Sequence, residues 1–311
     1  MRIWASLIGA ATVLLLGTAA AAPLARDLAP PPTVVAAATL SPAKKPVVLD
    51  PKPLPLLPNH RIVAYYGNPL SPLMGVLGQG TPRQMLARLA RQAAVYQALD
   101  PSHPVVKALE MVATIATASP GQGGTYSIRM PASVIESELK LARSAHALLI
   151  LDIQVGHSRV SSQVAYLKPF LKQPGVELAL DPEFDMNQIP GGIPGQEFGT
   201  MSYVAINRAI KVLHQLVVQY HLPPKVLIVH QFLPEMVQHW QKIKPLPGVS
   251  FIMDTDGFGT PAEKIANYHA FITDQPIGYG GFKLFYTQDT PLMTPAQVLA
   301  LKPPPLLVIY Q

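Results

Sequence analysis

Three pairs of polar side chains stand at the ends of consecutive apolar stretches in the middle of the chain. The pairs are Asp152 with Gln154, Asp181 with Glu183, and Asp254 with Asp256. Residues i and i+2 of an extended strand point to the same side, so each pair shares one face. Two carboxyl groups held close together resist joint ionisation, and one then keeps its proton near neutral pH. A protonated carboxyl beside an ionised one is what general acid catalysis of glycosidic bond cleavage requires, so we expect the five acids to be catalytic and Glu183 to be the proton donor.

Polar and aromatic residues close the other apolar stretches, and we expect them to contact a substrate. They are, together with Gln154, the residues Tyr65, Tyr66, His230, Gln231, Lys283, Tyr286 and Tyr310. Tyrosine rings can stack on a ligand, while amide and charged groups can hydrogen-bond to it. Glu110 is left out of the predicted site because it lies near the start of its apolar stretch, at the opposite end from the other polar residues.

The same residues also have purely structural explanations. Asp254 or Asp256 can belong to the turn that Gly257 begins. His230 can be a core histidine bonded to a carbonyl group. Lys283 can neutralise a buried carboxylate or face outward toward a helix. The whole set can therefore be satisfied by hydrogen bonds at strand ends.

Eight short apolar stretches are expected to be the strands that carry these residues. They span residues 61–66, 109–117, 147–152, 176–181, 225–230, 249–254, 281–286 and 305–310. Most are almost continuously apolar, which is typical of parallel strands buried on both faces.

Helix-length segments separate these stretches and three of them have clear starts. Thr81, Thr260 and Thr294 are each followed by proline and, two residues later, by Gln or Glu, which is the capping-box pattern. Eight strands with seven intervening helical segments predict a (β/α)8 TIM-type barrel whose eighth helix is missing. The alternative is an open doubly wound sheet, but the loop at 67–80 does not carry its G-x-G-x-x-G pattern.

The connection at 185–199 is unusual, with four glycines and two prolines directly after Glu183. Long connections of this kind often contact substrate. In a barrel the strands deliver their catalytic residues at their carboxyl ends. We therefore expect this segment to form a wall beside Glu183.

The N-terminal part differs in composition from the rest. Arg2 precedes an uncharged stretch that ends in alanines, which predicts a signal peptide over 1–22 and export from the cytoplasm. An uncleaved membrane anchor is the alternative for the same residues. Residues 23–58 contain ten prolines and predict an extended linker, so the barrel domain is assigned to 59–311.

Composition excludes several classes of protein. The chain has 311 residues, of which 49% are hydrophobic and 14% charged, so disorder throughout is excluded. It contains no cysteine, which excludes disulfides and thiolate metal sites. The net charge of +6 comes without any run of Lys and Arg, so we expect no nucleic-acid partner. We expect a monomer with no membrane span after signal cleavage.

The segment Asp181-Pro182-Glu183 resembles the D-x-E pair that ends the fourth strand in chitinase-like glycoside hydrolases of family 18. The resemblance implies a secreted TIM-barrel glycosidase in which the Glu is the general acid and the Asp orients it. Only this final pair matches. The upstream acidic positions and the tryptophan of the eighth strand are replaced, the latter by Ile309-Tyr310.

Three functions agree with these residues. The first is a hydrolase of a glycan or cell-envelope polysaccharide that needs no cofactor. The second is a metal-dependent ester or phosphoester hydrolase, in which the carboxylates and His230 bind Mg²⁺, Ca²⁺ or Mn²⁺. The third is a barrel that binds glycan without cleaving it. No H-x-H pair or H-E-x-x-H segment is present to indicate zinc.

Overall fold

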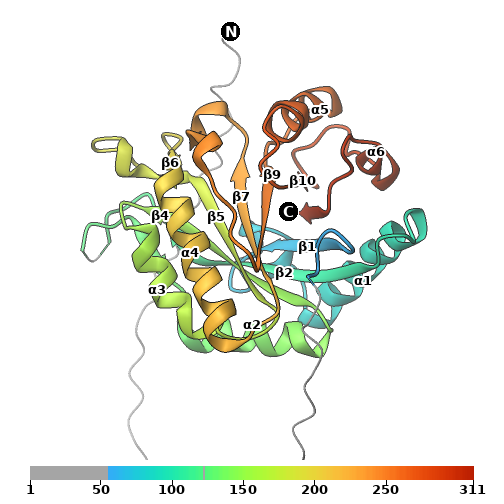
Figure 1. Cartoon of the computed structure of the whole chain (residues 1–311), viewed down its shortest axis with the longest axis horizontal. Helices are drawn as coiled ribbons and strands as arrows, with labels where there is room; N and C mark the ends of the chain where they lie inside the picture. Colours follow the sequence, from blue (N-terminus) through green and yellow to red (C-terminus); the bar gives the residue numbers. More distant parts are fainter. Residues whose placement is uncertain (1–54, 122) are drawn as a thin grey trace, which may run out of the picture. The chain divides into compact units, whose positions relative to one another are not determined.

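The computed structural model describes residues 55–121 and 123–311, and in these the chain forms a closed barrel (Figure 1). The predicted signal peptide and residues 23–54 of the predicted linker lie outside the described residues. Among the described residues, eight parallel strands form the barrel wall. They are β1 (Arg61–Gly67), β2 (Val105–Ala116), β4 (Leu148–Gly156), β5 (Val176–Asp185), β7 (Lys225–Gln231), β9 (Val249–Thr255), β10 (Tyr279–Leu284) and β11 (Leu307–Tyr310).

The sheet closes because β1 pairs with β2 on one side and with β11 on the other. The order around the barrel follows the chain, as expected when each strand leads through a covering segment to its neighbour. The (β/α)8 prediction is thereby confirmed and the open sheet is wrong. A short strand, β3 (Ser127–Arg129), extends the sheet by antiparallel pairing with the end of β2.

Six α-helices of the described residues cover the barrel. They are α1 (Pro82–Leu99), α2 (Ala132–Ser144), α3 (Val160–Leu171), α4 (Tyr203–Tyr220), α5 (Pro261–Tyr268) and α6 (Pro295–Leu299). The three predicted capping boxes are formed at the starts of α1, α5 and α6. Each threonine oxygen accepts the N–H of the third helical residue, whose side chain in turn accepts the N–H of the threonine.

One covering segment differs from the prediction. Within the described residues the connection from β7 to β9 has no α-helix, but two single-turn 3-10 helices, η4 (Pro234–Met236) and η5 (Trp240–Lys242), on either side of β8 (Val237–Gln238). Pro245 and Pro247 prevent a helix in this connection from continuing beyond residue 244. β8 pairs with β6 (Met201–Ser202) and so joins the connections that follow β5 and β7.

The second strand begins four residues before the predicted start. Its register places Glu110 beside Tyr66 of β1 and Ile150 of β4, in the middle of the wall. Lys107 interrupts the apolar sequence there, and its ammonium group donates to the carbonyl of Ala145 outside the barrel. Because Lys107 is charged, residues 105–108 were not included in the predicted strand.

Alternate strand residues face the barrel interior and the covering helices. Ile62, Ala64 and Tyr66 of β1 belong to the inner cluster, whereas Val63 and Tyr65 belong to the outer cluster between strands and helices. The same alternation on the other strands divides the core into these two layers. It also decides which polar residues meet inside the barrel.

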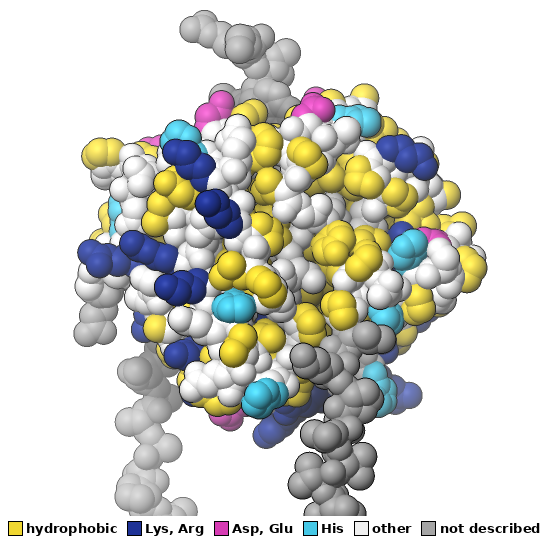
Figure 2. Space-filling model, in the orientation of Figure 1, with side chains coloured by type: hydrophobic (Ala, Val, Ile, Leu, Met, Phe, Trp, Pro, Cys, Tyr) yellow, Lys and Arg dark blue, Asp and Glu magenta, His cyan; other side chains and the backbone are white. Residues whose placement is uncertain are grey.

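The surface carries scattered apolar side chains and one area rich in basic residues. On the face shown in Figure 2, Lys and Arg gather over α3 and α4. Arg159, Lys168 and Arg208 line a groove between these two helices. None of the helices in the described part of the chain has the length and apolar character needed to cross a membrane.

Candidate active site

Inward-facing residues change from apolar to polar toward the C-terminal end of the barrel, the end at which the parallel strands finish. The polar residues there form what we call the interior polar cluster: Tyr66, Glu110, Asp152, Gln154, Asp181, Glu183, His230, Asp254, Asp256 and Lys283. All of them are buried except Glu183, which is half-buried. The three predicted pairs thus share one interior, with Glu183 as its most accessible carboxyl group.

His230 lies at the centre of three carboxylates. Its Nδ1 is 2.9 Å from Asp254 Oδ2 and 3.5 Å from Asp256 Oδ2, and its Nε2 is 3.1 Å from Glu110 Oε1. Burial lowers the pKa of His230, but the hydrogen bonds to Asp254 and Glu110 prevail and hold it well above its usual value. Carboxylate oxygens that face both ring nitrogens favour the imidazolium form, which donates from both.

Lys283 provides the second buried cation. Its Nζ is 3.0 Å from Asp256 Oδ2 and lies 3.7 Å from the centre of the Tyr66 ring. Burial lowers the pKa of Lys283, but the Asp256 carboxylate and other acids outweigh it and raise the pKa. Asp256 is thus held between Lys283 and His230.

A third set of contacts joins β1 to β4. The Tyr66 hydroxyl donates to Asp152 Oδ2 at 3.2 Å and accepts from Gln154 Nε2 at 3.3 Å. Gln154 Oε1 accepts the N–H of Ala116 at 3.0 Å. Gln154 is therefore fixed by the backbone of β2 and orients the tyrosine toward Asp152.

The pKa of the carboxyl group rises at several positions of the cluster. Burial and the Asp256 carboxylate raise the pKa of Glu183 to about 8, against the opposing effect of Lys283. Burial raises the pKa of Asp152 to about 6 and that of Asp181 well above its usual range. Glu183 is therefore protonated at neutral pH, as a general acid must be.

Three carboxylate oxygens of the cluster have no hydrogen-bond partner among the described residues. They are Glu110 Oε2, Asp152 Oδ1 and Asp254 Oδ1, and all three are buried. A buried oxygen of this kind requires a proton, water or a ligand group as its partner. Gly281 of β10 leaves the room that Asp254 occupies, since a Cβ atom there would lie 2.6 Å from Asp254 Oδ1.

The segment after β5 closes beside Glu183, where the sequence predicted a wall. The N–H of Gly199 donates to the Glu183 carbonyl at 2.6 Å. Asn187 Nδ2 donates to the Ser158 carbonyl at 2.7 Å, which ties the segment to the end of β4. Phe198, which is 60% exposed, packs edge-on against Phe232 at the end of β7 with 5.2 Å between ring centres.

Comparison with protein-family models finds no match, and comparison with curated proteins finds none. Among solved structures, the fold is similar to the crystal structure of a ruminal GH26 endo-beta-1,4-mannanase, at 9% identity and a TM-score of 0.36. The alignment covers 81% of this chain and 59% of the mannanase chain. What the site can do is therefore argued from its own residues.

Four of the predicted substrate-contacting residues lie outside the interior polar cluster. Tyr65 and Tyr310 face the outer layer because Tyr66 and Ile309 take the inward positions. Gln231 is turned outward next to His230, and its Nε2 donates to the Leu233 carbonyl at 3.1 Å. The fourth residue, Tyr286, follows β10 on the surface, and its ring stacks on that of Tyr310.

Asp289 does not supply a carboxylate to the interior either. Its oxygens accept the N–H groups of Gly259 and Phe285 at 3.0 and 2.9 Å, and one lies 3.2 Å from Lys264 Nζ. The residue therefore joins the loops that follow β9 and β10.

Glu110 is the cluster member that the sequence analysis left out. A glutamate inside an otherwise apolar inward row is the signal that could have identified it, once the strand was extended back to Val105. Its carboxylate faces His230 across the barrel and increases the excess of acids over bases there.

His230, Asp254 and Asp256 are the group of described residues whose atoms could hold a metal ion, with ligand atoms within 4.8 Å of one another. A histidine ligand must offer a lone pair. Both nitrogens of His230 instead meet carboxylates at hydrogen-bonding distance. The arrangement suits a protonated histidine better than a metal ligand.

Proposed function

We propose that this chain is a hydrolase that cleaves a glycosidic bond, with Glu183 as the general acid. The observation that carries the proposal is the state of Glu183: a half-buried carboxyl at the C-terminal end of the barrel, whose pKa is raised to about 8. A carboxyl group that is protonated at neutral pH, with a second carboxylate near it, is what departure of a sugar leaving group requires.

In this proposal Glu183 donates its proton to the glycosidic oxygen as the bond to the anomeric carbon breaks. The anomeric carbon forms its new bond either to water, whose proton the second carboxylate accepts, or to that carboxylate, from which water then releases the sugar. Asp256 is the second carboxylate, because its charge has the largest electrostatic effect on Glu183. Lys283 and His230 hold Asp256 in place. Asp181 lies on the same face of β5 as Glu183, two residues before it, and orients the acid.

A metal-dependent ester hydrolase is the second candidate. It is favoured by one observation, the convergence of His230, Asp254 and Asp256 within 4.8 Å. Carboxylate oxygens with a histidine nitrogen suit Mn²⁺, and oxygen ligands alone suit Mg²⁺ or Ca²⁺. Metal dependence of the activity separates this candidate from the first.

We also propose that the protein acts outside the cytoplasm on an envelope or extracellular polymer. The support is the sequence of residues 1–22, with Arg2 before an uncharged stretch that ends in alanines. Mass spectrometry of the exported protein should find a mature N-terminus near Ala22 or Pro23. An intact Met1 in the cytosol would contradict this.

The test of the activity is a screen of envelope and plant polysaccharides with wild type and Glu183→Gln. The glutamine keeps the size of the side chain and removes the acidic proton, so we expect a rate loss of roughly 10²- to 10⁴-fold. Glu136→Gln is the matched control, because Glu136 is exposed on the covering helix α2 and not in a loop that follows a strand.

Each outcome has a distinct meaning. Full activity of Glu183→Gln would remove the general acid assignment. Activity lost in EDTA and restored by Mg²⁺ or Mn²⁺ would favour the metal-dependent candidate. Binding of one glycan without turnover would identify a barrel that binds but does not cleave.

A further inference from the structure

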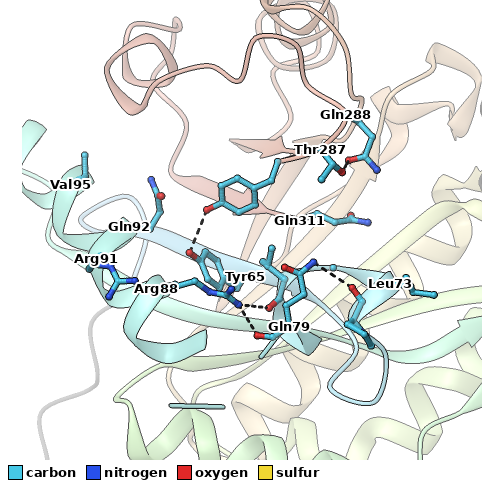
Figure 3. A pocket seen from close by; sticks show the side chains of 14 residues that line it. Tyr65, Leu73, Gln79, Arg88, Arg91, Gln92, Val95, Thr287, Gln288 and Gln311 are labelled. Carbon is cyan, nitrogen blue, oxygen red and sulfur yellow. Dashed lines mark hydrogen bonds between the residues drawn. The ribbon is translucent and has the colours of Figure 1, made fainter. Parts of the chain in front are cut away.

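A pocket of about 520 Å³ lies next to the barrel rather than inside it (Figure 3). Its walls come from α1, from the loop after β1 and from the residues that follow β10 and β11. Figure 3 shows Arg88, Arg91 and Gln92 of α1 on one side and Thr287, Gln288 and Gln311 on the other. The pocket is distinct from the interior polar cluster.

Both charged side chains that line this pocket are basic. Arg88 and Arg91 line it, and no Asp or Glu does. The sequence of α1 itself contains no acidic residue. Arg88 Nη2 donates to the Gln79 carbonyl at 2.7 Å, while its Nε is buried with no hydrogen-bond partner among the described residues. Arg91 is exposed, so its guanidinium group is available to an anion.

The opposite wall offers an aromatic face. The ring of Tyr286 stacks on that of Tyr310, with 5.2 Å between centres and 25° between planes, and Tyr286 is 38% exposed. Its hydroxyl lies 3.4 Å from that of Tyr65. A stacked tyrosine is a rigid apolar surface at low entropic cost, and amide side chains such as that of Gln311 bind hydroxyls through both donors and acceptors.

The pocket adjoins the C-terminal end of the barrel. Tyr65 faces the pocket, whereas the next residue, Tyr66, points into the barrel and contacts Asp152. Gln311 directly follows β11, and its carbonyl accepts the N–H of Tyr286 at 3.0 Å. The pocket and the interior polar cluster therefore lie on opposite sides of β1, toward the same end of the barrel.

We propose that this pocket binds a sugar unit that carries a carboxylate, with the anion on Arg91 and Arg88 and the ring against Tyr286. A guanidinium group binds a carboxylate in a planar, two-point geometry, and the tyrosine covers the apolar face of the sugar ring. The inference rests on the proposed function in one respect, which is that the substrate would be an acidic glycan. Binding of the single sugar does not depend on catalysis.

The test is binding of methyl β-glucuronide to the full chain, measured by titration calorimetry and by saturation-transfer NMR. Methyl β-glucoside is the neutral comparison and glucose 6-phosphate the phosphorylated one. Arg91→Gln should weaken binding of the glucuronide by at least about tenfold, as expected for loss of a charge-assisted contact. Tyr286→Ala should weaken the binding of the glucuronide and of the glucoside to the same extent.

Arg83→Gln is the matched control, since Arg83 is an exposed arginine of the same helix that does not line the pocket. It should bind like wild type, and the thermal midpoints of both arginine variants should agree. Glu183→Gln should also bind like wild type, which separates this inference from the proposed catalysis. Equal binding of the neutral glucoside, tighter binding of the phosphate, or no saturable binding of the glucuronide would each overturn the proposal.

Discussion

A proton-donating carboxyl group must recover its proton at the pH of the reaction, and at Glu183 this depends on Asp256. Burial and the Asp256 charge raise the pKa of Glu183 to about 8. The rate of glycan cleavage should therefore fall as the pH rises through about 8. Asp256→Asn removes the negative charge, so the residual activity should decline at a lower pH. Rate–pH profiles of the two proteins check this, and a decline at unchanged pH would contradict the coupling.

Asp152 should make the stability of the barrel depend on pH. Its folded-state pKa of about 6 lies above the usual 3.8, so the folded chain holds the proton more tightly than the unfolded chain. The resulting stabilisation is fully present below pH 3.8 and is lost as the pH rises through about 6. The pKa difference corresponds to about 3 kcal/mol.

Asp152→Asn stays neutral and should lose this part of the pH dependence, which urea unfolding between pH 4 and 8 can measure. The control is Asp274→Asn, because Asp274 is exposed in the loop before β10. Parallel stability curves for wild type and Asp152→Asn would show that Asp152 does not titrate in this range.

Residue by residue, the alternation of strand side chains explains which parts of the site the sequence could predict. The pairs at i and i+2 were placed together because a strand repeats every two residues. Tyr65 and Tyr66 were proposed together although adjacent residues face opposite sides, and only Tyr66 lies inside. Glu110 was missed because Lys107 concealed the start of its strand.

At the scale of the elements, helix starts with a capping box were the easiest feature to predict from the sequence, because a capping box depends only on residues three apart. Thr260 Oγ1 accepts the N–H of Glu263 at the start of α5. The next residue, Lys264, donates to the carbonyls of Gly257 and Lys283 and so ties the helix to β9 and β10. The start of α5 therefore supports the end of the barrel that holds the cluster.

Thr260→Ala should lower the free energy of unfolding by about 1 kcal/mol, the usual cost of losing an N-cap oxygen. Thr260→Ser keeps the oxygen and should remain close to wild type. Chemical denaturation of the two variants measures the difference. Equal losses in both would show that the methyl group, and not the cap, matters.

The covering segment between β7 and β9 could not be predicted with the same accuracy. The structure of this segment depends on the pairing of β8 with β6. β6 lies between β5 and α4 and is therefore distant in sequence. Local propensity contains no information about such a pairing.

For the whole molecule, the count and spacing of apolar stretches were enough to predict eight parallel strands, because parallel strands need covering segments of helix length. Closure itself, seen in the pairing of β1 with β11, was not readable from local sequence. The boundary between linker and barrel is a related question, since it depends on contacts made at the base of the barrel.

Leu57 lies inside the predicted linker, but it is only 1% exposed and belongs to the inner cluster with Ile62, Leu306 and Leu307. We therefore expect a chain that begins at residue 55 to be as stable as the full chain, and one that begins at residue 61 to be less stable. Losing a buried leucine costs about 2–5 kcal/mol. Leu57→Ala in the full chain should reproduce most of that loss in urea unfolding. Equal stability of the chains that begin at 55 and 61 would show that the barrel is complete without Leu57 and would place the domain boundary after it.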